Sequence, residues 1–273
     1  MLAIVFPNLN PIALELSIYD YSIAIYWYGI AYVVGIFLAQ FVAKKIENKY
    51  RLAGLSNNDF DKLIVYLIFG IILGGRIGYV TFYMPYLFIT DFFEVFNIRG
   101  GGLSFHGGLI GVAFAILLFC MQTKKEFWRV NDLIACVAPI GIFCGRIANF
   151  VNAELVGRKT NVAWGVIFPY YDSPRHPSQL YEAFAEGLLL FILLQLALQL
   201  GFGKYKKGQF TGLFLILYGL FRFILEFYRQ PDNHVGFFFS YFSMGQLLSV
   251  PMLFLGIFLM IFIREEEPHR VKN

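Results

Sequence analysis

The chain has 273 residues, of which 58% are hydrophobic and only 15% are charged. An ordinary soluble domain carries about 25% charged residues, so the composition excludes a water-soluble globular protein. The net charge of +4 is spread along the chain and forms no basic tract of the kind that binds nucleic acid. Nucleic acid is therefore not expected as a partner.

Seven apolar segments recur along the chain, each about 20 residues long. A helix of that length, at about 1.5 Å per residue, crosses the ~30 Å hydrocarbon core of a bilayer. The predicted spans are 23–43, 63–83, 103–123, 130–150, 180–200, 209–229 and 244–263. The pattern predicts an all-α polytopic membrane protein that forms one integral membrane domain over residues 1–273. Short outer-interface helices and loops are expected in the longest connections, 84–102, 151–179 and 230–243.

The basic residues predict the orientation of these spans, because cytoplasmic loops carry an excess of lysine and arginine. One side of the predicted topology holds Lys44, Lys45, Lys49, Arg51, Lys62, Lys124, Lys125, Arg129, Lys204, Lys206, Lys207, Arg264, Arg270 and Lys272. The other side holds Arg99, Arg158, Lys159, Arg175 and Arg229. The N-terminus is therefore expected outside and the C-terminus in the cytoplasm.

The three remaining arginines, Arg76, Arg146 and Arg222, fall within predicted spans. Charged residues inside a membrane are rare and tend to be functional. Arg76 stands in GGRIGY of the second span, and the third span begins with SFHGG, which contains His106. Taken alone, a histidine in such a place is more often structural than catalytic.

The fourth span ends in GRIANFVNAELVGR, which carries five strong hydrogen-bonding side chains. Arg146 and Asn149 are three residues apart and share one helix face. The motif continues with Asn152, Glu154 and Arg158. Such a density of polar groups is unusual at the end of a membrane span.

The sixth span carries a second polar face, formed by Tyr218, Arg222, Glu226 and Arg229 at helical spacing. One interpretation is an Arg222–Glu226 pair that neutralises itself and only holds helices together. Two further carboxylates, Glu182 and Glu186, share a face at the start of the fifth span, and we interpret them as structural.

The polar ends of spans three, four and six all face the outer side in this topology. Guanidinium groups bind phosphate oxygens, and carboxylates and amides hold hydroxyl groups, so the set suits an anionic lipid headgroup. A metal site is not indicated, because the sequence contains no HExxH motif and His176, His234 and His269 lack ligand spacing. The three cysteines fall within spans, where they are interpreted as core residues: Cys120, Cys136 and Cys144.

GRIANFVNAELVGR resembles the signature of the bacterial phosphatidylglycerol–prolipoprotein diacylglyceryl transferase family, roughly GRxGNFxNxExxG. The likeness covers nearly the whole chain, through YWYG at 26–29, GGRIGYV at 74–80, SFHGG at 104–108, HPSQLYEA at 176–183 and RFILEFYRQPD at 222–232. Ala148 and Ala153 stand where the family commonly has glycine, and Val156 where an aromatic residue is frequent. The polar members of the motif are intact.

The resemblance implies a multi-pass enzyme of the bacterial plasma (inner) membrane whose active site faces the outer leaflet. Such an enzyme moves the sn-1,2-diacylglyceryl group of phosphatidylglycerol onto the lipobox cysteine thiol of a prolipoprotein signal peptide. A thioether forms and glycerol 1-phosphate is released, in the first step of lipoprotein maturation. No metal or organic cofactor is implied.

The resemblance also implies roles for individual residues. His106 would act as the base for the thiol, Arg146 and Arg222 would clamp the phosphate, and Glu226 would orient Arg222. The implied substrate-binding residues are Tyr28, Asn149, Glu154, Gly157 and Tyr218. Gly157 is equally well explained as a helix terminator, and Tyr28 as an interfacial aromatic residue.

Other functions remain open on the residues alone. An anionic-solute transporter also needs intramembrane arginines, but it predicts polar groups along a path to the cytoplasmic side. A membrane protein that only binds a lipid headgroup needs the same polar set without the chemistry. An intramembrane protease is disfavoured, because no Ser/Lys, Ser/His or paired intramembrane Asp arrangement is apparent in the sequence.

Overall fold

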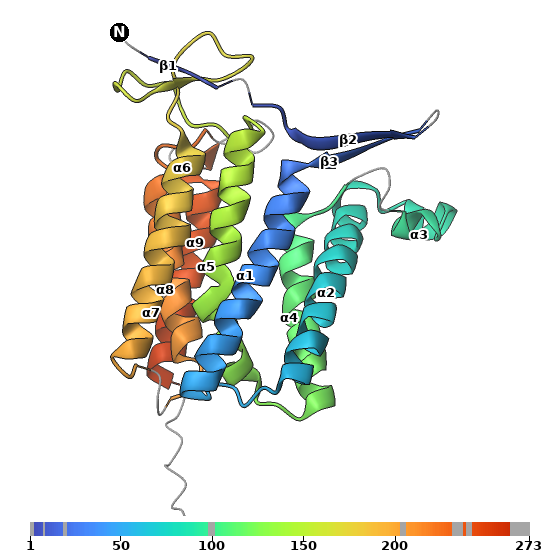
Figure 1. Cartoon of the computed structure of the whole chain (residues 1–273), viewed down its shortest axis with the longest axis vertical. Coiled ribbons are helices and arrows are strands. Elements are labelled where there is room, and N and C mark those ends of the chain that lie inside the picture. Colours follow the sequence, from blue (N-terminus) through green and yellow to red (C-terminus); the bar gives the residue numbers. More distant parts are fainter. Residues whose placement is uncertain are drawn as a thin grey trace, which may run out of the picture. The chain divides into compact units, whose positions relative to one another are not determined.

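The computed structural model describes residues 3–7, 9–18, 21–97, 102–202, 206–230, 237–238 and 242–262. Its backbone contacts divide the chain into two compact units. Unit 1 comprises Met1–Ala43 and Ile134–Asn273, and unit 2 comprises Lys44–Leu133. The long helices within each unit run alongside one another (Figure 1).

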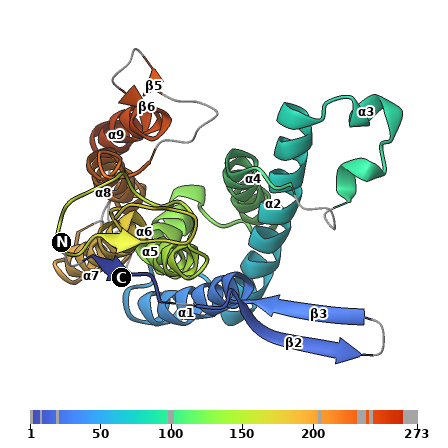
Figure 2. The same cartoon turned by 90° about the horizontal axis from the view of Figure 1, so that it is seen from above.

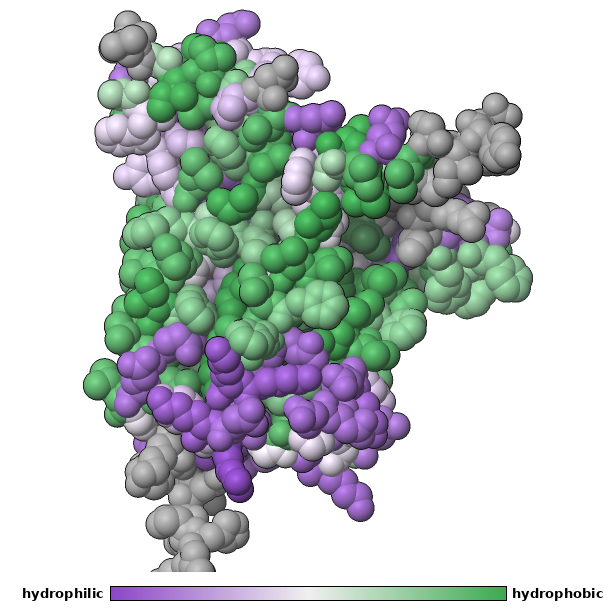
Figure 3. Space-filling view, in the orientation of Figure 1, coloured by the Kyte–Doolittle hydropathy of each residue, from purple (hydrophilic) through white to green (hydrophobic). Residues whose placement is uncertain are grey.

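Helices dominate the described part of the chain, as the composition predicts. Five helical segments there are long and apolar enough to cross a membrane: α1 (Trp27–Tyr50), α2 (Asn57–Tyr83), α5 (Phe127–Val151), the run Ser178–Gln199 and α9 (Met244–Phe262). Two shorter helices are also apolar, α4 (Phe105–Thr123) and α8 (Gln209–Leu225). Hydrophobic side chains cover the middle of the helices and hydrophilic ones gather at their ends (Figure 3). The expected all-α polytopic class is confirmed.

Each of the seven predicted spans falls on one of these helices, and which of them cross a bilayer stays a prediction. The first helix begins at Trp27, four residues later than the predicted span, because Tyr21–Tyr26 forms strand β3. The fifth segment is not one regular helix. It consists of α6 (Ser178–Glu182), the π-helix η2 (Ala183–Leu189) and α7 (Leu190–Gln199).

Unit 2 is built around α2 and α4, which lie side by side (Figure 2). Glycines on both helices let the backbones meet. A Cβ atom on Gly78 would lie 2.6 Å from the Cα of Gly107, and one on Gly111 would lie 2.8 Å from the Cα of Gly74. Small residues of this kind are how helices approach closely in an apolar medium. The GGRIGY and SFHGG motifs therefore supply the contact between α2 and α4.

Two short helices of unit 2, α3 (Leu87–Thr90) and η1 (Glu94–Phe96), follow the end of α2. They pack on α2 through a small core of Val80, Leu87 and Val95, which are 0%, 8% and 1% exposed. The sequence predicts short helices in this connection, and the structure contains them.

Unit 1 contains strand pairs that the sequence analysis did not predict. β1 (Ile4–Val5) pairs in parallel with β4 (Val166–Ile167), and β2 (Ile12–Ile18) pairs antiparallel with β3. A third pair joins β5 (Phe237–Phe238) and β6 (Phe242–Ser243). The segments IALELSI and YSIAIY alternate apolar and smaller or polar residues with period two, which is typical of strands.

A loop of unit 1, residues 152–177, is fixed to the end of α8. Gly157 forms an antiparallel bridge with Arg229. The Arg158 guanidinium donates hydrogen bonds to the carbonyl oxygens of Arg229 at 2.9 Å and Glu226 at 3.2 Å. Arg175 donates to the carbonyl oxygen of Gly157 at 2.9 Å. These contacts fix the loop beside the residues that form the site.

Candidate active site

Six charged side chains of unit 1 meet at the facing ends of three helical segments. Arg146 comes from the last two turns of α5, two carboxylates come from the α6–η2 run, and the remaining residues come from α8 and the turn after it. This ionic cluster consists of Arg146, Glu182, Glu186, Arg222, Glu226 and Arg229.

Glu182 lies at the centre of the ionic cluster. Its Oε2 is 2.9 Å from Nη1 of Arg146, and its Oε1 is 3.4 Å from Nη1 of Arg222 and 3.5 Å from Nη1 of Arg229. Glu186 bridges two of the same arginines, at 3.2 Å to Nη2 of Arg146 and 3.6 Å to Nη1 of Arg222. Both carboxylates are fully buried.

Glu226 has the orienting contact that its spacing predicts. Its Oε2 lies 2.9 Å from Nη2 of Arg222, one helical turn earlier in the chain. The first turn of α9 packs against this carboxylate, since a Cβ atom on Gly245 would lie 2.6 Å from Oε2 of Glu226. Glu226 therefore holds one edge of the Arg222 guanidinium in place.

The π-helix η2 sets the position of Glu186. Gly187 lies against α5, where a Cβ atom would come within 2.7 Å of the Cβ of Phe143. This close approach brings Glu186, the residue before Gly187, to Arg146, three residues after Phe143. Single π-helical turns occur frequently at functional sites, and here the turn places a carboxylate between two arginines.

Among the residues that the structure describes, the formal charges of the ionic cluster cancel, because it contains three guanidinium groups and three carboxylates. The side chains of Arg146 and Arg222 are only 16% and 15% exposed. Charges that far from water are stable only when they are paired. The guanidinium groups of the cluster are therefore already paired with the chain's own carboxylates.

Asn149 and Glu154 contact each other beside the end of α5. The Asn149 amide Nδ2 donates to Oε1 of Glu154 at 2.7 Å, and the Glu154 amide donates to the Asn149 carbonyl at 3.0 Å. The chain reverses here through Ala153 and Leu155, whose φ angles are +54° and +55°. Ala153 thus occupies a left-handed conformation that favours glycine, which the sequence analysis noted as the family's usual residue.

Two tyrosines expected in the site lie near Arg146. The hydroxyl of Tyr28 is 3.2 Å from that of Tyr32, one turn later on α1, and Tyr32 interacts electrostatically with Arg146 and Glu154. Tyr218 precedes Arg222 by one turn on α8 and interacts electrostatically with Arg146 and Glu186. Of the expected residues of unit 1, Tyr218 and Arg222 therefore interact with Arg146, and Tyr28 is linked to it through Tyr32.

Gly157 lies where no side chain fits. A Cβ atom there would come within 2.7 Å of both the His176 Cβ and the Tyr228 carbonyl oxygen. The amide of Gly157 also donates to the His176 carbonyl at 3.0 Å. This packing accounts for glycine at the position without a substrate. Burial lowers the pKa of the His176 imidazole, so the ring is neutral at pH 7.

His106 and Arg76 belong to unit 2. His106 stands in the first turn of α4, and its side chain lies outside the described residues, as do His234 and His269. Arg76 serves its own unit: Nε donates to the Val95 carbonyl and Nη2 to the Glu94 carbonyl, both at 3.0 Å. This intramembrane arginine is therefore paired with backbone carbonyl groups of its own unit.

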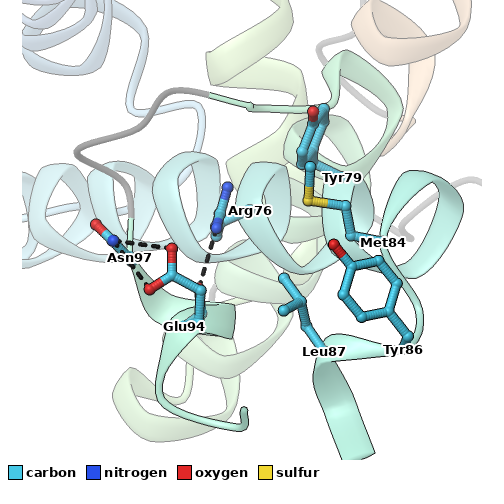
Figure 4. Close-up of a pocket in the computed structure, with 7 residues that line it drawn as sticks. All are labelled: Arg76, Tyr79, Met84, Tyr86, Leu87, Glu94 and Asn97. Atoms are coloured by element: carbon cyan, nitrogen blue, oxygen red, sulfur yellow. Dashed lines mark hydrogen bonds between the residues drawn. The ribbon is translucent and has the colours of Figure 1, made fainter. Parts of the chain in front are cut away.

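Arg76 lines a hollow of about 270 Å³. Figure 4 shows its guanidinium directed at the short helix η1, with Tyr79, Met84, Tyr86 and Leu87 along the other side. The Glu94 carboxylate accepts two hydrogen bonds from the Asn97 amide, at 2.9 and 3.0 Å. The hydrogen bonds of Arg76 to the Val95 and Glu94 carbonyls hold η1 against α2.

The structure places Glu182 and Glu186, which the sequence leads us to interpret as structural, in contact with Arg146 and Arg222. A signal was present. Each intramembrane arginine needs a counter-charge, and the arginines of spans four and six had only Glu226 assigned between them. Two carboxylates four residues apart on the neighbouring span were the natural partners.

Together, the fold and the site define a helical polytopic membrane protein with a buried arginine–glutamate cluster suited to an anionic group. Comparison with known proteins identifies the family. Residues 12–262 match the family model described as prolipoprotein diacylglyceryl transferase. The chain belongs to this family.

Proteins named phosphatidylglycerol–prolipoprotein diacylglyceryl transferase match almost the whole chain. The phosphatidylglycerol–prolipoprotein diacylglyceryl transferase of Rickettsia bellii is 48% identical over 257 residues, which cover 94% of this chain and 96% of the relative. The proteins of that name from Rickettsia felis and Rickettsia typhi are 47% identical over 255 residues and 46% identical over 256 residues. Each alignment covers 93% of this chain, with 96% of the first relative and 97% of the second.

Proposed function

We propose that this chain transfers the diacylglyceryl group of phosphatidylglycerol to the cysteine thiol of a prolipoprotein lipobox and releases glycerol 1-phosphate. The observation that carries the proposal is the buried ionic cluster around Arg146 and Arg222 in a chain of this family. A phosphodiester headgroup is the anion that such a pair of guanidiniums fits.

The reaction is a displacement at the carbon of the diacylglyceryl group that is bonded to the phosphate oxygen. The substrate sulfur forms the new carbon–sulfur bond, and the bond from that carbon to the phosphate oxygen breaks. Its electron pair leaves with the phosphate, so negative charge grows there in the transition state. Arg146 and Arg222, already oriented by carboxylates, stabilise that charge without having to reorganise.

The thiol must lose its proton, and His106 is the residue we assign as its base. A free thiol has a pKa near 8.5, so a base at neutral pH increases the thiolate fraction. His106→Gln is then expected to stop transfer while phosphatidylglycerol still binds, and a peptide whose thiol is already acidified should restore part of the rate. A variant that fails to bind lipid and responds to no such peptide would make His106 a scaffold residue.

The decisive assay uses purified protein, phosphatidylglycerol radiolabelled in its diacylglyceryl part, and a lipobox peptide. Label should appear on the peptide and be absent when the peptide cysteine is replaced by serine. A transporter of anionic solutes, the alternative function, would instead move a labelled phosphate compound across a vesicle membrane and leave the peptide unlabelled. A protein that only binds the headgroup would do neither.

We also propose that residues 1–273 form one membrane domain of seven spans, with the N-terminus outside and the site toward the outer leaflet of the bacterial plasma membrane. The β1–β4 pair supports this topology, because paired strands must lie on the same side of a bilayer. A reporter after Asn273 should be cytoplasmic, and one near Lys159 should be external. Both reporters on one side would contradict it.

A further inference from the structure

The charge of the ionic cluster does not complement the charge of phosphatidylglycerol, the substrate in the proposed function. The ionic cluster is formally neutral, and the phosphodiester of phosphatidylglycerol carries one negative charge. Glu182 and Glu186 each contact both Arg146 and Arg222, and Nη1 of Arg222 lies 3.4 and 3.6 Å from them without a hydrogen bond. A phosphate that enters between these buried arginines therefore competes with the two carboxylates for the same guanidinium groups.

The three carboxylates differ in how firmly they are held. Glu182 contacts all three arginines, with its shortest distance 2.9 Å to Arg146. Glu226 lies 2.9 Å from Arg222 and is packed against the first turn of α9 at Gly245. These two carboxylates hold the arginines in place whether or not an anion is bound.

Glu186 has the longest contacts of the three carboxylates. It lies 3.2 Å from Arg146 and 3.6 Å from Arg222, whereas the shortest contact of Glu182 and of Glu226 is 2.9 Å. Its Oε2 accepts a hydrogen bond from Nη2 of Arg146, and its Oε1 makes none. Glu186 also lies between the two arginines that the proposed function assigns to the phosphate.

We propose that Glu186 is an internal counter-anion, which the phosphate of phosphatidylglycerol replaces between Arg146 and Arg222 and which returns when glycerol 1-phosphate leaves. This proposal rests on the proposed function. The leaving phosphate carries more negative charge than the diester does, so it would stay bound to two bare guanidiniums. A carboxylate that competes for the same donors weakens substrate binding and speeds product release.

The test is the kinetics of Glu186→Gln, which keeps the shape of the side chain and removes its charge. The substrate is phosphatidylglycerol at varied mole fraction in phosphatidylcholine nanodiscs. We expect the KM for phosphatidylglycerol to fall about tenfold or more, because Arg146 and Arg222 no longer pair with Glu186 and both guanidinium groups are free to bind the phosphate. We expect kcat to fall as well, with inhibition by added glycerol 1-phosphate appearing at a concentration at least about tenfold lower.

Matched variants separate the charge from the fold. Asp61→Asn makes the same chemical change at an exposed carboxylate of unit 2 that pairs with Lys44 at 3.5 Å, and its KM and kcat should equal those of the native chain. Glu186→Asp keeps the charge and should show no increase in affinity. If Glu186→Gln does not fold, Glu186→Met has a similar length, also removes the charge, and carries the same expectation.

A merely structural Glu186 gives a different pattern. An unchanged or raised KM in both charge-removing variants, with a lower melting temperature, overturns the counter-anion role. So does an equal gain of affinity in Glu186→Asp. If the native chain itself labels no peptide, the proposed function has failed. Failure of the counter-anion role alone leaves peptide labelling by the native chain intact, so the two failures are distinguishable.

Discussion

The α2–α4 pair of unit 2 and the α5, η2 and α8 group of unit 1 hold helices together in opposite ways. Between α2 and α4, glycines remove side chains and the backbones meet. Between α5, η2 and α8, long charged side chains span the gap and compensate one another. The first contact is short and apolar, and the second is longer and ionic.

The difference follows from what each contact can do in an apolar medium. Backbone contact gains dispersion energy over many atoms and binds nothing else. An ionic contact is stable only while every charge keeps a partner, and a different anion is able to take over one of those partners. The glycine contact is therefore suited to a scaffold, and the ionic contact to a site.

The largest effect is expected from Arg146→Lys, which keeps the charge but removes the planar fork that contacts Glu182 and Glu186 at once. Loss of a preorganised charged donor in such a site lowers the rate by about 100-fold or more. The measurement is peptide labelling at matched protein level. Near-native turnover would reduce Arg146 to a structural ion pair.

The glycine contact is tested by Gly111→Ala. The added methyl group would lie 2.8 Å from the Cα of Gly74 and 2.9 Å from the carbonyl carbon of Gly70, so α2 and α4 must separate. Overpacking of this kind costs about 1–3 kcal/mol, which thermal unfolding in detergent should report. Gly108→Ala is the control, because its nearest neighbour would be 3.7 Å away. Equal melting temperatures for the two variants would contradict the backbone contact.

Gly157 sharpens the same comparison within unit 1, since it was expected to bind substrate and is packed like a scaffold glycine. Gly157→Ala should lower the free energy of unfolding by about 1–3 kcal/mol, because the new methyl group meets Tyr228 and His176. KM for phosphatidylglycerol should stay unchanged in the folded fraction. Gly29→Ala, where nothing lies within 4 Å, is the control. A raised KM with native stability would instead show that Gly157 contacts the substrate.

Ala153→Gly should stabilise the protein. Ala153 has a φ angle of +54°, a conformation that costs an L-residue roughly 1–2 kcal/mol and glycine nearly nothing. After the greater chain entropy that glycine loses on folding, a net gain of about 0.5–1 kcal/mol remains. Unfolding of the variant should occur at a slightly higher temperature. A lower melting temperature would show that the turn is not strained.

The smallest effect concerns pH and the loop at Gly157. Burial lowers the pKa of His176 below its unfolded value, so the neutral form is favoured by folding. That stability is complete above pH about 6.5, the ordinary histidine pKa, and is lost as the pH falls through that value toward the lower folded pKa. The melting temperature should therefore decrease between pH 7 and pH 5 in the native chain. The decrease should be smaller in His176→Gln.

The helices followed from the sequence because their signal is long and repeated. An apolar run of about 20 residues predicts a helix whatever its neighbours are. Strand β1 did not, because it contains two residues and its partner, β4, lies about 160 residues away in the chain, and no local pattern of that length separates a strand from a loop. Strands β2 and β3 do carry a period-two pattern, but the first predicted span includes residues 23–26 of β3.

The site was predictable in part, for a related reason. Arg146 and Asn149 stand in one motif, and Arg222 and Glu226 stand in another, so spacing alone places each pair on one side of a helix. Glu182 and Glu186 required the pairing between helices, and Glu186 also required the π-helical turn. The turn depends on the close approach of Gly187 to Phe143, which no sequence period records.

The parallel pairing of Ile4–Val5 with Val166–Ile167 has a consequence for biosynthesis. During translation the first strand emerges long before its partner exists. At roughly 5–20 residues per second, β1 waits on the order of ten to thirty seconds for residue 167. In the topology proposed above, the start of the chain crosses the membrane and remains there unpaired while four helices are inserted. The loop at 152–177 closes onto it only after the ribosome has passed the midpoint of the message.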